Sequence, residues 1–157
     1  MFTNLLTMIK SSTVLAIASD HGGFKMKEFI KRKLEDANYK IKDFGTFSDE
    51  SVDYPDFIHP LSKAINDGEY DIGIIICGSG NGAQITANKY NNVRAALCWN
   101  EEQAMLSRMH NKANILSIPG RFVPFDQAWR IVEIFLSTDF EGGRHLQRVN
   151  KISKILK

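Results

Sequence analysis

The residues with the clearest potential for chemistry stand together in the stretch Cys77–Gly78–Ser79–Gly80–Asn81–Gly82. Its glycines let the backbone turn tightly, so that successive N–H groups point at one spot, and a helix expected over 83–89 adds its positive N-terminal end. This combination predicts a cradle for an anion. The stretch lacks the Gly-Lys-Ser/Thr ending of the nucleotide P-loop and the glycine spacing of the dinucleotide fingerprint. A tight turn without further function is the alternative for the glycines taken alone.

Cysteine and histidine side chains near this stretch could supply reactive groups. Cys77 stands at the edge of the cradle, where amides and a helix terminus favour the thiolate, so we expect a reactive thiol. We expect Cys98, at the end of another apolar run, to be a buried apolar filler. Asp20 can be explained as the N-cap of a helix, but that role does not account for His21 beside it. His59, inside an expected helix, is expected to be structural.

Alternating apolar and amphipathic stretches indicate how these residues are positioned. Continuous apolar runs predict buried strands over 13–19, 71–77, 93–98 and 114–118, and polar–apolar alternation over 39–44 predicts a half-exposed strand. Apolar stripes at helical spacing predict helices over 23–37, over 57–66 and after Pro124. This alternation is typical of a parallel sheet with helices on both faces. We therefore predict an α/β fold with a doubly wound, Rossmann-like, five-stranded parallel sheet.

The predicted fold places the candidate site at one edge of the sheet. In an open parallel sheet, ligands bind beyond the carboxyl ends of the strands. The stretches that follow the predicted strands are 20–23, 77–82, 99–100 and 119–121, and the long connection over 45–54 has a length that is more often functional than not. His110 and Asn111 precede the last strand and so lie on the opposite side. We expect a second subunit to bring His110 near Cys77.

The end of the chain carries a second basic signal. Arg144 and Arg148 are four residues apart, so on a helix they project from one face and could grip a phosphate. A solvated basic face is the alternative. Val149, Ile152 and Ile155 make the other side of this helix apolar, so we expect it to pack against another element, with a partner subunit as the candidate.

Length and composition narrow the class of protein. The chain has 157 residues, of which 43% are hydrophobic and 24% charged, with a formal net charge of +2. We expect a single globular domain over 13–157 and a tail over 1–12. The small charge gives no strong electrostatic reason to expect nucleic acid or an anionic membrane as partner, and no apolar run is long enough to span a bilayer. Two cysteines exclude a disulfide scaffold and a Cys-only zinc site. We expect a soluble cytoplasmic protein that needs no metal.

Several motifs together resemble a known family, ribose-5-phosphate isomerase of type B, in the group that includes galactose-6-phosphate and allose-6-phosphate isomerases. The resemblance covers the chain from 13 to about 155, with the motifs in the family's order. The matching stretches are 19–23 (SDHGG), 53–55 (DYP), 77–82 (CGSGNG), 87–89 (ANK), 106–108 (LSR) with His110–Asn111, and 141–145 (EGGRH) with Arg148.

The resemblance implies a doubly wound sheet, a dimer or tetramer with active sites at the subunit interface, and no cofactor. By motif position, Cys77 corresponds to the base that moves a proton between two sugar carbons, and the backbone of 78–82 to the group that holds the enediolate. Ser79 stands where the family often has Thr and keeps the hydroxyl. Asn81 occupies a position that is frequently apolar.

The same resemblance assigns the remaining roles. Asp20 and His110 correspond to residues that serve ring opening, and Asn111 to one that positions the substrate. Basic side chains are implied to hold the phosphate: His21, Arg144, Arg148 and, after a glycine as in some members, Arg121.

The activity implied is the interconversion of ribose 5-phosphate and ribulose 5-phosphate through a cis-enediolate. This reaction needs no redox cofactor, because a base removes a proton beside a carbonyl and returns it one carbon along. A six-carbon substrate, as in allose-6-phosphate or galactose-6-phosphate isomerase, stays open, as does the choice between dimer and tetramer. Two other classes also fit the residue types: a cysteine hydrolase with Cys77 as nucleophile, and a sugar-phosphate sensor without catalysis.

Overall fold

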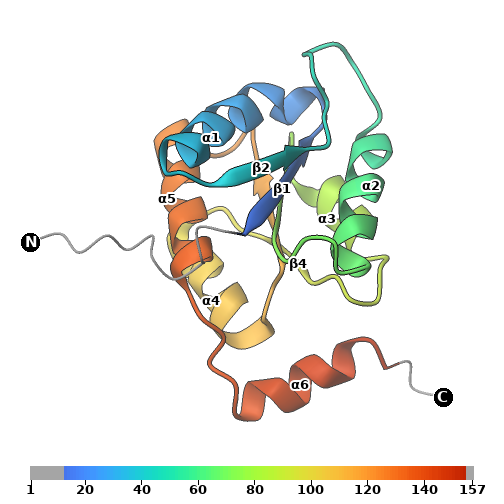
Figure 1. Ribbon diagram of the computed structural model, residues 1–157, viewed down its shortest axis with the longest axis vertical. Helices are drawn as coiled ribbons and strands as arrows, with labels where there is room; N and C mark the ends of the chain where they lie inside the picture. The colour runs from blue at the N-terminus through green and yellow to red at the C-terminus, as the bar shows by residue number, and fades with distance from the viewer. Residues whose placement is uncertain (1–12, 155–157) are drawn as a thin grey trace, which may run out of the picture.

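The computed structural model describes residues 13–154, so the tail predicted for 1–12 lies outside the described residues. A five-stranded parallel sheet forms its centre, in the order β2-β1-β3-β5-β4 (Figure 1). This sheet confirms the doubly wound fold expected from the sequence. Each strand falls within or one residue beyond a stretch predicted to be extended: β1 (Val14–Ser19), β2 (Lys40–Asp43), β3 (Gly73–Cys77), β4 (Ala95–Leu97) and β5 (Ile115–Pro119).

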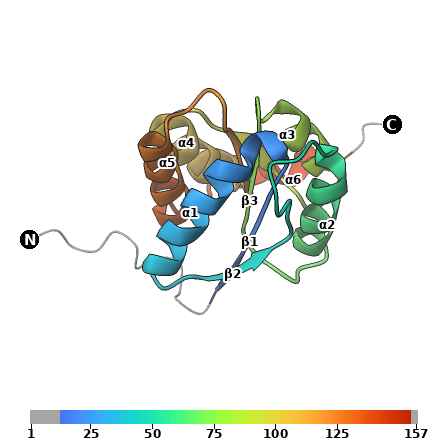
Figure 2. The same ribbon diagram turned by 90° about the horizontal axis from the view of Figure 1, so that it is seen from above.

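Helices cover both faces of the sheet (Figure 2). One face carries α1 (Phe24–Asp36), α4 (Glu101–Asn111) and α5 (Phe125–Ser137), and the other carries α2 (Tyr54–Asn66) and α3 (Asn81–Ala87). Alternate residues of β1 explain the two layers, because Leu15 and Ile17 are buried in the first apolar cluster whereas Ala16 and Ala18 are buried in the second. A parallel sheet covered on both sides needs such continuously apolar strands.

Helix α4 is an element for which the sequence analysis made no prediction. The side chain of Asn100 caps it by accepting a hydrogen bond from the Gln103 N–H at 2.9 Å, and two glutamates occupy its first turn. Its buried positions, Ala104 and Ser107, are small or polar. The apolar stripe on which helix prediction depends is therefore weak here, although the capping signal is present.

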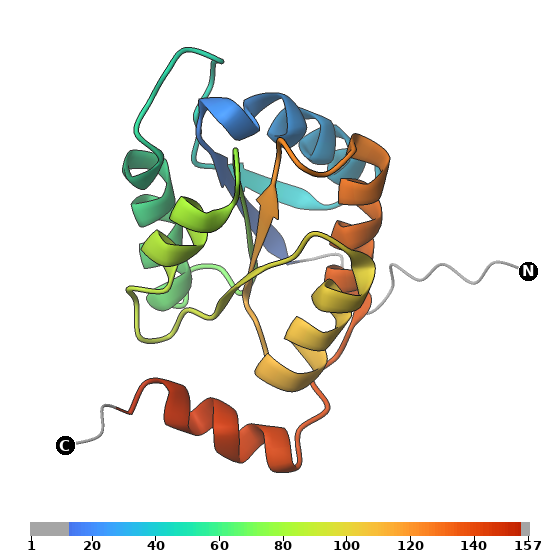
Figure 3. The ribbon, with the colours of Figure 1, turned by 180° about the vertical axis from the view of Figure 1, so that it is seen from behind.

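Helix α6 (Arg144–Ile152) stands apart from the two layers. It lies beyond the end of the sheet at which the strands begin, opposite the end where the short 3-10 turn η2 (His21–Gly23) follows β1 (Figures 1 and 3). His145 is its buried residue, while Leu146 and Ile152 are exposed. The packing of this helix on a partner subunit therefore stays a prediction. No helix within 13–154 is both long enough and apolar enough to cross a membrane.

Candidate active site

The loop after β3 forms a cradle of main-chain amides around the sulfur of Cys77. The Gly80 N–H donates to Cys77 Sγ at 3.1 Å, and the amides of Ala83 and Ser79 also stabilise the thiolate form. The turn depends on Gly80, whose φ of +76° is unfavourable for other residues. A Cβ atom at Gly80 would also lie only 2.4 Å from Leu97 Cδ1. The predicted cradle is therefore present, with the sulfur in it.

The thiol of Cys77 is more deeply buried than the sequence analysis expected. Its residue is 4% exposed. Burial raises the pKa of the Cys77 thiol, and the negative charge of Asp20 adds to this effect, so together they outweigh the amides of Ala83, Gly80 and Ser79. The expectation that this environment favours the thiolate was wrong for the isolated chain. Burial also raises the pKa of Cys98 to about 11.

Asp20 and His21 hold the end of β1 against neighbouring loops. Asp20 is 8% exposed, and its Oδ1 accepts a hydrogen bond from the Gly23 N–H at 3.0 Å, which confirms its predicted role as an N-cap. His21 Nδ1 lies 3.2 Å from both the backbone N and the backbone O of Val52, so its tautomer decides which of the two it bonds. His21 therefore ties the long connection before α2 to the edge of the sheet.

Two backbone segments lie close together beside the cradle, and the side chain of Arg121 lies over them. The Gly120 N–H donates to the Cys77 carbonyl at 2.8 Å, and the Arg121 N–H donates to the Gly78 carbonyl at 3.0 Å. Cβ atoms built on Gly22 and Gly78 would each lie 3.4 Å from the Arg121 guanidinium. The exposed Arg121 thus places its positive charge over two glycine-lined strand ends, where an anionic ligand would gain from it.

Ser79 and Asn81 lie at the mouth of the cradle. Both are exposed, and Ser79 Oγ accepts a hydrogen bond from the Asn81 N–H at 3.3 Å. Tyr54 joins them from α2, because a Cβ atom at Gly82 would come within 2.6 Å of its ring. The sequence analysis gave Tyr54 no role. The Asp-Tyr-Pro motif at 53–55, which matches the family, was the sequence signal that could have identified Tyr54.

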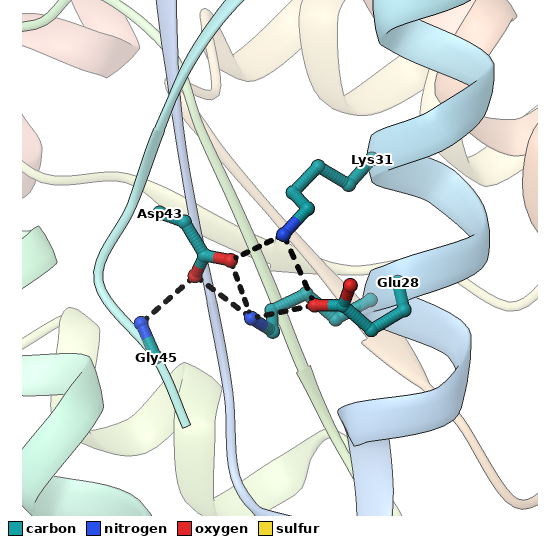
Figure 4. Close-up of polar contacts among 5 residues, drawn as sticks. Glu28, Lys31, Asp43 and Gly45 are labelled. Atoms are coloured by element: carbon teal, nitrogen blue, oxygen red, sulfur yellow. Dashed lines mark hydrogen bonds and ion pairs between the residues drawn. The ribbon is translucent and has the colours of Figure 1, made fainter. Parts of the chain in front are cut away.

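A partly buried ion network supports the backbone beside Asp20 (Figure 4). Asp43, the last residue of β2, accepts hydrogen bonds from Lys27 Nζ at 2.6 and 2.8 Å, from Lys31 Nζ at 3.0 Å and from the Gly45 N–H at 2.9 Å. Gly45 in turn accepts a hydrogen bond from the Ser19 N–H at 2.6 Å. The network therefore links helix α1, through Gly45, to the residue before Asp20.

Charge pairing offsets the cost of burying this network. The side chain of Lys27 is fully buried, and that of Asp43 is 14% exposed. Burial disfavours the Asp43 carboxylate, but the hydrogen bonds from Lys27, the Gly45 amide and Lys31 outweigh it and hold the pKa of Asp43 below its ordinary value. Asp43 therefore stays ionised at neutral pH.

The remaining predicted site residues gather at the opposite end of the molecule. His110 and Asn111 end α4, while Arg144 and Arg148 project from α6 and are exposed. As predicted for His110, the end of α4 that carries it lies at the opposite end of the sheet from the end of β3, and helix α6 with its two arginines lies there too (Figure 3). We call Asp20, His21, the 77–82 loop and Arg121 the carboxyl-edge group. The amino-edge group consists of His110, Asn111, Arg144 and Arg148.

Two further side chains accompany the amino-edge group, and the sequence analysis gave neither a role. The rings of His110 and His145 stack with centroids 4.2 Å apart and an interplanar angle of 8°. Glu141 Oε2 lies 3.7 Å from His110 Nε2. A nearby cavity of about 620 Å³, lined by residues of α3, β4, α4 and α6, includes Asn111 but none of the carboxyl-edge group.

The comparisons with known proteins all find sugar isomerases. The model of the Ribose/Galactose Isomerase family matches residues 15–152. The ribose-5-phosphate isomerase B of Escherichia coli strain K12 is 41% identical over 141 residues, which are 90% of this chain and 95% of that protein. A crystal structure of the ribose 5-phosphate isomerase of Thermotoga maritima superposes with a TM-score of 0.90 at 46% identity, over 92% of this chain and 99% of that one.

A third similar protein carries a ligand. The crystal structure of ribose-5-phosphate isomerase B from Mycoplasma genitalium, with bound ribulose-5-phosphate, has a TM-score of 0.86 and 40% identity. The match covers 90% of this chain and 95% of that one.

Proposed function

The chain belongs to the ribose/galactose isomerase family, and from that premise we propose that it interconverts ribose 5-phosphate and ribulose 5-phosphate, with Cys77 as the base. The similar proteins of E. coli and T. maritima carry this activity in their names, and that of M. genitalium binds ribulose-5-phosphate. The observation that carries the proposal for this chain is the position of Cys77 Sγ among main-chain amides at the carboxyl end of the sheet.

Proton transfer by one base is the chemical step of the proposal. The Cys77 thiolate takes the proton from C2 of the open-chain aldose, and the electron pair of that C–H bond forms the enediolate. The hydroxyl proton of O2 passes to O1 across the cis-enediolate, and the thiol returns its proton to C1, which leaves C2 as the carbonyl of the ketose. The raised pKa of Cys77 makes its thiolate scarce at neutral pH, so only a small fraction of the free chains holds the active base, although each thiolate is a stronger base than an ordinary one.

Stabilisation of the enediolate oxygens is the second requirement. Main-chain N–H groups of the 77–82 loop are fixed by the turn itself, so they need no reorganisation when negative charge develops. The Arg121 guanidinium beside Gly22 and Gly78 adds positive charge at the same edge. Removing one such donor typically costs a few kcal/mol of transition-state stabilisation.

The amino-edge group completes the proposed site from a second copy of the chain. Within one chain it lies at the other end of the sheet, yet it holds His110 and Asn111, proposed for ring opening and substrate positioning, and the phosphate-binding pair Arg144 and Arg148. The exposed Leu146 and Ile152 on α6 give that helix an apolar surface that a second copy can cover. Distant phosphate binding anchors the flexible open-chain sugar while the carbons react.

The experiment offers ribose 5-phosphate, allose 6-phosphate and galactose 6-phosphate in parallel to the purified protein, with proton NMR in heavy water. We expect turnover of ribose 5-phosphate with exchange at C2, unaffected by a chelator. Cys77→Ala should lower kcat by about 10²–10⁴-fold while sugar-phosphate binding and the unfolding transition persist. Cys98→Ala, the matched control, should keep the turnover per folded molecule.

Other results would contradict the proposed base, the proposed function or the proposed substrate. A Cys77→Ala variant that keeps most of its activity would remove Cys77 as the base. Tight binding of ribose 5-phosphate by the wild-type protein without turnover would favour the sensor. An acyl-enzyme trapped on Cys77 by a slow ester, with no exchange at C2, would favour the hydrolase. Preference for a six-carbon sugar phosphate would keep the mechanism and change the substrate.

A further inference from the structure

Three side chains next to the amino-edge group have the composition of a metal site. His110 Nε2 lies 3.7 Å and His145 Nε2 lies 3.9 Å from the same atom, Glu141 Oε2. One ligand atom from each of the three residues lies within 4.8 Å of the others. His110 comes from the end of α4, whereas Glu141 precedes α6 and His145 lies in the first turn of α6, so only folding brings the three together.

The buried ring of His145 provides a second, independent indication of a ligand at this cluster. The residue is 5% exposed, and its Nε2 has no hydrogen-bond partner among the described residues. A buried ring nitrogen without a partner is costly, because it loses its bonds to water and gains none in return. The same nitrogen is close to Glu141 and stands beside the stacked ring of His110, so a ligand placed among them would satisfy it.

We propose that His110, Glu141 and His145 bind a zinc ion, and that zinc bound there inhibits isomerisation. The binding stands by itself, whereas the inhibition rests on the proposed function of His110 in ring opening. A water molecule takes the fourth position.

The distances fit a tetrahedral zinc ion after small movements. Zinc bonds to imidazole nitrogen and carboxylate oxygen are about 2.0–2.2 Å long, which places tetrahedral ligand atoms about 3.4 Å apart. The two separations from Glu141 Oε2, 3.7 and 3.9 Å, exceed this by half an ångström or less, and the ligand atoms of the two histidines lie within 4.8 Å of each other. Glu141 and His110 are partly exposed, so rotation of these two side chains can close the remaining distances and turn the stacked rings apart.

The ligand types select among metals. Two imidazoles with one carboxylate suit zinc and related transition ions, whereas magnesium and calcium prefer oxygen ligands. Coordination requires a neutral imidazole, so both histidines would ligate zinc in their neutral forms. Arg144 and Arg148 also lie close enough to act on His145, and their positive charge weakens cation binding. We therefore expect micromolar rather than nanomolar affinity.

Inhibition follows from what coordination does to His110. A zinc-bound Nε2 neither donates nor accepts a proton, so His110 can no longer assist ring opening. The two added positive charges also lie beside the arginines proposed to hold the phosphate. Zinc should therefore act as a reversible inhibitor that a chelator removes, whereas the metal-free protein is the active form.

The test measures binding and activity separately on the full chain. Calorimetric titration with zinc chloride should show about one ion per chain, and magnesium chloride should show no binding. Glu141→Gln and His145→Gln should each weaken zinc binding by about ten-fold or more. His59→Gln removes a surface histidine elsewhere, and Cys77→Ser removes the thiol that could compete for zinc, so both should bind as the wild type does.

The outcomes distinguish this inference from the proposed function. If zinc binding is absent, or survives both Glu141→Gln and His145→Gln, the site is wrong whatever the enzyme does. Loss of zinc binding in Cys77→Ser would show that the thiol binds the ion, and this result would also overturn the proposed site. Binding that follows the predicted variants, without inhibition of a working isomerase, would contradict the inhibitory role. If no isomerase activity exists, the calorimetry still decides the binding.

Discussion

The carboxyl-edge group and the amino-edge group differ in how the fold holds them. Around Cys77, main-chain hydrogen bonds, a left-handed glycine and close backbone contacts fix the carboxyl-edge group within one chain. Arg144 and Arg148, by contrast, project from a helix that packs mainly on α4. The first group is preorganised by its own chain, and the second needs a neighbour to have a function. Substitutions in the residues that support the first group should therefore affect stability, whereas substitutions in the second group should affect catalysis alone.

The largest effect on stability should come from the ion network that supports the carboxyl edge. Asp43→Asn removes the carboxylate that pairs with the fully buried Lys27 and leaves that cation with Glu28 at 3.2 Å. Loss of one partner of a buried ion pair costs about 3–5 kcal/mol, and we expect about 3 kcal/mol of unfolding free energy from urea titration. The matched control is Asp67→Asn, whose partner Lys63 is exposed, with at most about 1 kcal/mol. Equal losses for both variants would refute the special role of the network.

Sequence reasoning found the carboxyl-edge group because its signals are local. Strand periodicity located the end of β3, and the glycine pattern after it implied the turn that places amides around Cys77. The pKa direction of Cys77 was missed because burial depends on the packing of distant residues, which a motif does not reveal. The buried Lys27 network was missed for the same reason, since lysines on a helix usually face solvent.

For the amino-edge group, the motifs predicted roles for the residues but not how the side chains are arranged. The resemblance to known isomerases assigned roles to His110 and Arg144, and strand order placed His110 away from Cys77. The stacked ring of His145 and the approach of Glu141 were not predicted, because they depend on how α6 folds back onto α4. Helix α4 itself gave only a weak apolar stripe.

Substitutions in the amino-edge group should sharpen the contrast. Arg144→Ala or Arg148→Ala should lower kcat/KM for ribose 5-phosphate by about 10–100-fold, because each removes a charged hydrogen bond worth about 1.5–3 kcal/mol. The unfolding free energy should change by less than about 0.5 kcal/mol, since both side chains are exposed. Lys151→Ala, an exposed cation on the same helix, is the control and should leave kcat/KM unchanged. Equal losses for a non-phosphorylated sugar would argue against phosphate contact.

Acid should weaken the carboxyl-edge support in a defined direction. The pKa of Asp43 is lowered in the folded protein, so its contribution to stability is fully present above the ordinary aspartate pKa of about 3.9. That contribution is lost as the pH falls through the lower folded value. Unfolding free energies between pH 6 and pH 2 should therefore decline less steeply for Asp43→Asn than for the wild type. Parallel profiles would show that Asp43 makes no such contribution.

The most direct test of the account is complementation between two inactive variants, Cys77→Ala and His110→Ala. If each active site takes Cys77 from one copy and His110 from another, a mixed dimer of the two variants contains one site without a substitution. Random mixing makes half of the dimers mixed, so roughly a quarter of wild-type activity should return. A mixture of Cys77→Ala with Asp20→Ala, both in the carboxyl-edge group, should stay inactive. A first mixture as inactive as its parents would contradict a site shared between copies.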